Sequence, residues 1–128
     1  MNRYADSSES ILECLEEVKR NKCEIQEIVN NFISGEPIMF IGNTSMNGYY
    51  IAGVYLIQNV ETGLQYIGRS TNIFRRIYEH TRGKFRNIDV ANLRIWLLEE
   101  EYEWGRQVEL ERKYMKEYQC DLNDVMYS

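Results

Sequence analysis

Arg76 and His80 are two residues whose types and spacing could support chemistry. They lie four positions apart in the segment IFRRIYEHTR, in which Ile73, Phe74 and Ile77 recur with helical spacing. A helix therefore places them one turn apart at the edge of its apolar face. There a guanidinium can hold a phosphate, and an imidazole with a pKa near 6.5 can move a proton. The alternative is an exposed arginine and a histidine that interacts with the end of the helix.

Glu111 is a carboxylate that lies among apolar residues. On a helix over 106–119 it falls in the middle of one face, which is made by Val108, Leu110, Tyr114, Met115 and Tyr118. Burying a carboxylate without a partner costs several kcal/mol, so it should be paired, protonated or bound to a metal. Two explanations stay open, namely an ion pair with Arg76 and a hard cation such as Mg²⁺.

Two tyrosines can meet across a predicted hairpin. Residues alternate between the faces of a strand, so Tyr55 shares one side of the first strand with Gly53 and Ile57, while Tyr66 and Gly68 share one side of the second. Paired aromatic rings are usually half-buried packing. Gly68 also leaves room for a backbone or a phosphate to come close to Tyr66.

Positive charge is concentrated in the middle of an acidic chain of net charge −5. Residues 51–90 carry six basic and three acidic side chains, and the basic ones are Arg69, Arg75, Arg76, Arg82, Lys84 and Arg86. Such a cluster attracts anions, although a solvated basic helix face would have the same composition.

The elements that position these residues follow in the order β-β-α-β-α. The runs GVYLIQ and LQYIG flank a turn at Gly63 and predict an antiparallel hairpin. Ser70 or Thr71 can cap a helix that ends at Gly83, a third strand covers 92–100, and a last helix covers 106–119. We therefore expect an α+β fold with a small three-stranded antiparallel sheet flanked by helices, over 51–128.

A helical extension is predicted to precede this module. Residues 9–34 have helical periodicity, with a capping box at Ser10 and Glu13, a stop at Gly35 and Pro37, and a short extended piece and loop up to residue 50. We expect residues 1–50 to pack on the module or to form a homodimer or partner contact.

The composition indicates a single soluble domain that is neither secreted nor in a membrane. The chain has 128 residues, no apolar run long enough to span a bilayer, and no signal-like N-terminus. Cys14, Cys23 and Cys120 form an odd set without CxxC spacing, which favours reduced thiols in the cytoplasm.

The ordered set of motifs resembles the GIY-YIG nuclease superfamily. It begins with GVY at 53–55 and YIG at 66–68, and Arg76 and His80 follow Tyr66 by ten and fourteen residues. Glu111 occurs where that family has its metal-binding glutamate, with an aromatic residue three positions later, and Asn123 matches the family's terminal asparagine. The resemblance covers residues 51–128.

This resemblance implies an endonuclease that hydrolyses DNA phosphodiester bonds with activated water. It implies that Glu111 holds one Mg²⁺ or Mn²⁺, that Arg76 neutralises phosphoryl charge, and that Asn123 positions the site. Tyr55 is the first choice for the general base, with Tyr66 and His80 holding or relaying its proton. The expected substrate contacts are Gly68, Arg69, Ser70, Arg75 and Lys84. The alternatives are an idle binding module on this fold and a nuclease for RNA or branched DNA.

Overall fold

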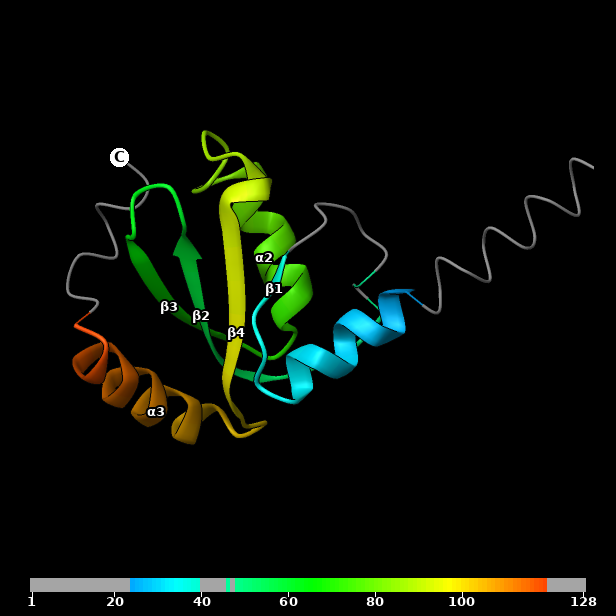
Figure 1. The fold of residues 1–128 in the computed structure, drawn as a ribbon. Coiled ribbons are helices and arrows are strands. Elements are labelled where there is room, and N and C mark those ends of the chain that lie inside the picture. The colour runs from blue at the N-terminus through cyan, green and yellow to red at the C-terminus, as the bar shows by residue number, and fades with distance from the viewer. Residues whose placement is uncertain (1–23, 40–45, 47, 120–128) are drawn as a thin grey trace, which may run out of the picture.

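A four-stranded antiparallel sheet forms the centre of the computed structural model, which describes residues 24–39, 46 and 48–119. The strand order is β1-β4-β2-β3, so that β1 and β3 are the two edges. Helices α2 and α3 lie on opposite sides of this sheet (Figure 1). The predicted α+β class and the β-β-α-β-α order are confirmed, with one additional short strand.

The predicted hairpin is formed by β2 (Gly53–Asn59) and β3 (Gln65–Ser70). Gly63 makes its turn with a φ of 76°, a left-handed conformation that glycine adopts without steric cost. Tyr55 pairs directly with Gly68, and Ile57 pairs with Tyr66. The two tyrosines therefore lie on one face of the sheet, as the alternation in the sequence predicted.

Strand β4 (Leu93–Glu100) follows the short 3₁₀ helix η2 (Val90–Asn92) and pairs with β2 along its length. The register shifts between Val54 and Tyr55, where the ladder is irregular. The fourth strand is β1 (Ile38–Met39), which pairs with β4 through Ile95 and Arg94. The sequence predicted this piece to be extended but did not assign it to the sheet.

Helix α2 (Ile73–Arg82) follows β3 and covers one face of the sheet. Its N-cap is Asn72, whose side chain accepts a hydrogen bond from the Arg75 N–H, so the expected cap at Ser70 or Thr71 is corrected by one or two residues. The Ser70 hydroxyl accepts the Asn72 N–H instead. The helix ends at Gly83, as predicted.

The core on this face also includes the N-terminal extension. Residues 24–33 are helical and end before Gly35, which has a φ of 85° as its predicted stop position requires. Phe32 packs 5.0 Å from Phe74 between ring centroids. Four core residues come from the extension, namely Val29, Phe32, Ile38 and Met46. The capping box at Ser10 and Glu13 lies outside the described residues.

Helix α3 (Trp104–Glu117) covers the opposite face, next to β2 and β3. Its apolar side meets the small cluster of Val54, Leu56 and Ile67 with Leu110, Tyr114 and Met115. Tyr118 was predicted on the same face but is exposed, because it follows the last turn of the helix. Within the described ranges, no helix has the length and apolarity that a membrane crossing requires.

We predict that Gly53→Ala destabilises the protein by about 2–4 kcal/mol, because it adds both backbone strain and a clash. Gly53 has a φ of 152°, and a Cβ there would lie 2.1 Å from the Glu99 carbonyl oxygen. The measurement is the free energy of unfolding in urea. Gly48→Ala is the matched control, since nothing lies within 4 Å of its Cβ position; equal losses in both variants would contradict the prediction.

Candidate active site

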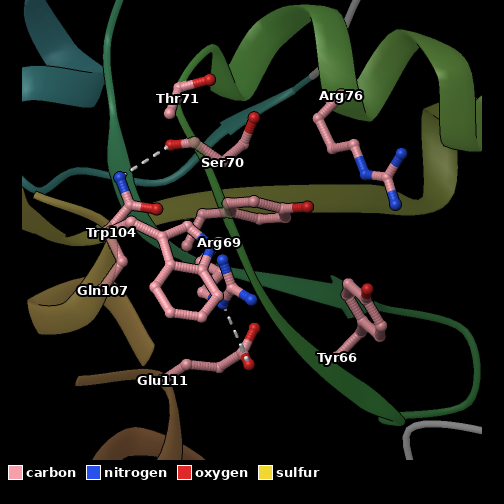
Figure 2. Close-up of a pocket in the computed structure, with 9 residues that line it drawn as sticks. Tyr66, Arg69, Ser70, Thr71, Arg76, Trp104, Gln107 and Glu111 are labelled. Atoms are coloured by element: carbon pink, nitrogen blue, oxygen red, sulfur yellow. Dashed lines mark hydrogen bonds and ion pairs between the residues drawn. The ribbon is translucent and has the colours of Figure 1, made fainter. Parts of the chain in front are cut away.

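A pocket of about 390 Å³ lies beside the edge strand β3 (Figure 2). Side chains from both faces of the sheet line it, and they are Tyr55, Tyr66, Arg69, Ser70, Thr71, Arg76, Trp104, Gln107 and Glu111. Four predicted catalytic residues are therefore brought together from β2, β3, α2 and α3. Two predicted substrate contacts, Arg69 and Ser70, line the same pocket.

Tyr55 and Tyr66 form the wall of the pocket that belongs to the main core. Their ring centroids are 6.4 Å apart, and both residues are buried. A Cβ at Gly68 would lie 2.5 Å from the Tyr55 hydroxyl oxygen and 2.9 Å from Tyr66 Cε1. The two phenol rings thus fill the space that Gly68 leaves open. The direct contribution of Gly68 is to let Tyr55 and Tyr66 occupy these positions.

Glu111 reaches the pocket from α3 and forms an ion pair with Arg69. The distance from Arg69 Nε to Glu111 Oε1 is 3.6 Å, and the two side chains are 28% and 26% exposed. Burial raises the pKa of the Glu111 carboxyl above its usual value, and the nearby Arg69 guanidinium opposes that rise. Arg69 also lies 5.2 Å above the Trp104 ring. The carboxylate therefore has a cationic partner, as its burial required.

Arg76 is not that partner, so the ion pair with Arg76, one of the two explanations that the sequence left open, is wrong. Its guanidinium contacts Glu79 one turn later on α2, with Nη1 3.3 Å from Oε2. Arg75 also pairs with Glu79, at 3.5 Å. The Arg76 side chain remains 48% exposed and lines the pocket from the α2 side. It can therefore turn toward an anion at modest cost, because an exposed ion pair is weak.

His80 lies behind Tyr66 and does not line the pocket. It is 4% exposed and packs against Tyr66 and Phe85, at 5.7 Å and 5.2 Å between ring centroids. Burial and the positive charges of Arg76 and Lys84 lower its pKa from 6.5 to about 4. The expectation of an unperturbed pKa is thus corrected. His80 is neutral at pH 7, and its Nε2 has no hydrogen-bond partner in the described part of the chain.

Gln107 is a pocket residue that the sequence analysis missed. It is fully buried in the first half of α3, and its Nε2 donates to the carbonyl oxygens of Glu101 at 2.7 Å and Ser70 at 3.4 Å. The helical wheel held the signal that could have found it, because Gln107 lies four residues before Glu111 on the same side of the helix. Thr71 and Trp104 also line the pocket without having been predicted.

The remaining predicted contacts lie near the pocket or beyond it. Arg75 lines a second pocket, with Tyr50, Asn72, Tyr78 and Glu79. Lys84 Nζ lies 5.8 Å from the centre of the Tyr66 ring. Asn123 lies outside the described residues.

The donor set of the pocket suits a hard cation that keeps most of its water. No group of three or more His, Cys, Asp or Glu side chains that could hold a metal occurs within the described ranges. Glu111 is the acidic lining residue, and the hydroxyl or amide oxygens of Tyr55, Ser70 and Gln107 accompany it. Mg²⁺ is commonly held by one or two carboxylates, several waters and substrate phosphate oxygens, so this set fits it.

Comparisons with known proteins show which protein family and which solved structure this chain is similar to. A family model described as the GIY-YIG catalytic domain matches residues 51–123, which is more than half of the chain. Among solved structures, the fold is similar to the catalytic domain of homing endonuclease I-TevI, with a TM-score of 0.49 and 21% identity over 56% of this chain and 92% of that chain. No curated protein sequence matches.

We predict that the single imidazole titrates near pH 4 and that folding weakens as the pH falls from about 6.5 to 4. The pKa of His80 is lower in the folded state, so the unfolded chain binds more protons in that window. The histidine ring resonance reports the pKa by NMR, and urea unfolding reports the stability. The free energy of unfolding of His80→Phe should fall less than that of the parent over the same pH window. A pKa of 6.5 for His80 in the folded parent would contradict this prediction.

Proposed function

The chain belongs to the family of GIY-YIG catalytic domains and is a GIY-YIG-type endonuclease; from this premise we propose that it hydrolyses DNA phosphodiester bonds with a divalent cation and an activated water. The observation that supports the proposal is the convergence of Glu111, Arg76, Tyr55 and Tyr66 on one polar pocket. Among the described residues, Glu111 is the one carboxylate that lines the pocket, which favours one metal ion over two.

Glu111 holds the cation, Mg²⁺ or Mn²⁺, in this proposal. When bound, the ion supplies a Lewis acid that polarises the phosphate and stabilises the charge of the leaving 3′ oxygen. The Glu111 carboxylate, which contacts Arg69 at 3.6 Å, exchanges that guanidinium for the ion. Arg69 is then released next to the pocket, where it contacts the phosphate backbone together with Ser70.

Arg76 neutralises the charge that develops on the phosphoryl oxygens. Its guanidinium lines the pocket opposite α3, and its exposed contact with Glu79 is easily exchanged for a phosphate. Groups that stabilise such developing charge typically contribute on the order of 10²–10³ in rate.

Tyr55 is the first choice for the group that takes the proton from the attacking water. Because a phenol ordinarily loses its proton only at about pH 10, Tyr55 can take that proton only as a phenolate, after its own phenolic proton has passed to a neighbouring acceptor or to solvent. The water oxygen then bonds to phosphorus as the bond to the 3′ oxygen breaks. Tyr66 lies 6.4 Å from Tyr55, and His80 lies 5.7 Å from Tyr66, between ring centroids. His80 is neutral at pH 7, so its ring can accept a hydrogen bond and help to hold or relay the proton, but its pKa of about 4 makes it a weak base that keeps a proton only transiently.

Binding outside the pocket comes from the basic residues on the same side of the module. Arg75 and Lys84 extend the positive charge of Arg69 and Arg76, and Asn123 completes the site as the family pattern implies. One such site cuts one strand, so duplex cleavage requires a second copy or a second binding event. Described residues of the extension pack on the module, and we propose that residues 1–50 also offer a homodimer or partner contact. The odd number of cysteines without CxxC spacing favours a cytoplasmic location.

We predict that Glu111→Ala and Arg76→Ala each reduce Mg²⁺-dependent nicking of plasmid DNA by at least about 10²-fold. The first removes the metal carboxylate and the second removes the phosphoryl cation. Glu109→Ala and Lys116→Ala are matched controls, because both residues are exposed on α3 and neither lines the pocket. Thermal melting shows whether the variants fold; two folded variants that cut like the parent would overturn the proposed function.

We also predict cleavage of duplex DNA in a panel that contains single-stranded, duplex and branched DNA and RNA. The measurement is the initial rate of cleavage of each substrate, once with an excess of Mg²⁺ at about 5 mM and once with EDTA. A rate confined to RNA or to branched DNA would replace the DNA assignment with that alternative. Binding to all substrates without any cleavage would instead support the idle binding module.

A further inference from the structure

The amide of Gln107 is held in one orientation by two backbone carbonyls. Its Nε2 donates to the Glu101 oxygen at 2.7 Å and to the Ser70 oxygen at 3.4 Å. Carbonyl oxygens only accept hydrogen bonds, so a rotation that exchanged the amide oxygen and nitrogen would place oxygen against oxygen. The position of Oε1 therefore follows from the fold.

That fixed oxygen is a buried acceptor in the pocket. Gln107 is 0% exposed, and Oε1 has no hydrogen-bond partner among the described residues. Figure 2 shows the amide nitrogen directed at Ser70 and the amide oxygen on the side of the Arg69 side chain, and Gln107 and Arg69 both line the pocket. A buried acceptor without a donor or a cation costs about 1–3 kcal/mol. The contacts of Nε2 fix where Oε1 lies, but no described residue donates a hydrogen bond to it.

Gln107 and Glu111 occupy one side of α3. They are four residues apart, which puts their side chains one turn from each other, and both line the pocket. Two ligands at this spacing can face a single metal ion, as in helical metal motifs. Carboxylate and amide oxygens are both ligands of hard cations, and Mg²⁺ or Mn²⁺ with Glu111 alone would depend on water and substrate for the rest of its shell.

We propose that Gln107 Oε1 is the second protein oxygen of the cation site that Glu111 forms, contacting the ion or one of its bound waters. This inference rests on the proposed function. An amide is neutral, so one carboxylate and one amide leave a divalent ion with net positive charge. The site thereby gains a fixed ligand without losing its attraction for phosphate, which a second carboxylate would weaken.

The unmodified protein allows a direct test by NMR. We expect diamagnetic Mg²⁺ to shift the side-chain carbonyl carbon resonance of Gln107, while that of Gln26 stays unchanged. Gln26 is a suitable reference because it donates to Asn30 in the extension and lies outside the pocket. If Mg²⁺ shifts the carboxyl carbon of Glu111 and leaves the side-chain carbonyl carbon of Gln107 unchanged, Gln107 does not contact the ion or its bound water and the inference is wrong.

Variants of Gln107 test how much its side chain contributes to the affinity for Mn²⁺. Gln107→Met keeps the length of the side chain but removes both polar atoms, and we expect it to weaken Mn²⁺ binding, measured by EPR, by about 10–100-fold. Gln26→Met is the matched control and should bind Mn²⁺ like the parent. A purely anchoring role would lower the melting temperature of Gln107→Met and leave the Mn²⁺ affinity of the folded protein unchanged, which would overturn the inference.

A double-mutant cycle with Glu111→Gln separates this inference from the proposed function. If both residues serve one ion, the losses in Mn²⁺ affinity are coupled, whereas independent effects add. Additive losses contradict a shared site. If the parent protein binds no Mn²⁺, the metal site as a whole is wrong. If the parent binds Mn²⁺ and the affinity is reduced by Glu111→Gln but not by Gln107→Met, only the inference about Gln107 is wrong.

Discussion

The position of β3 at the edge of the sheet is the constraint on which the site depends. A central strand separates the two faces of a sheet, whereas an edge strand lets side chains from both faces approach around its free side. Tyr55, Tyr66 and Arg76 come from the face that α2 covers, while Glu111 and Gln107 come from α3 on the other face. Their common pocket exists because no further strand of the described chain lies between them.

The electrostatics of the pocket combine the partly buried acid Glu111 with cations from separate elements. Arg69 on β3 forms an ion pair with Glu111. Arg76 on α2 lines the pocket and forms an ion pair with Glu79, which does not line it. The same cations affect the buried imidazole, because Arg76 and Lys84 add to the desolvation that lowers the pKa of His80. Burial, with a smaller contribution from these positive charges, thus lowers the pKa of the histidine, while the same charges attract an anion to the pocket.

Local patterns predicted the elements better than they predicted the partners. The pairing of Tyr55 and Tyr66 followed from alternation, and the position of Glu111 on the α3 face followed from the helical period. The choice of Arg69 as its partner did not follow, because that choice depends on how α3 packs on β3. The pKa of His80 also required tertiary information, since its main cause is burial by Phe85 and its neighbours. The two-residue strand β1 gave too short a pattern to place in a sheet.

The folding unit includes strand β1 and is therefore longer than the region that the family model matches. The extension contributes a strand beside β4 and also Phe32, which fills space against Phe74 under α2. A chain that began at residue 51 would present the inner faces of α2 and the sheet to water, with the aromatic ring of Phe74 among them. Helix α2 carries Arg76, so the position of one wall of the pocket depends in part on a segment whose described residues contribute no side chain to the lining.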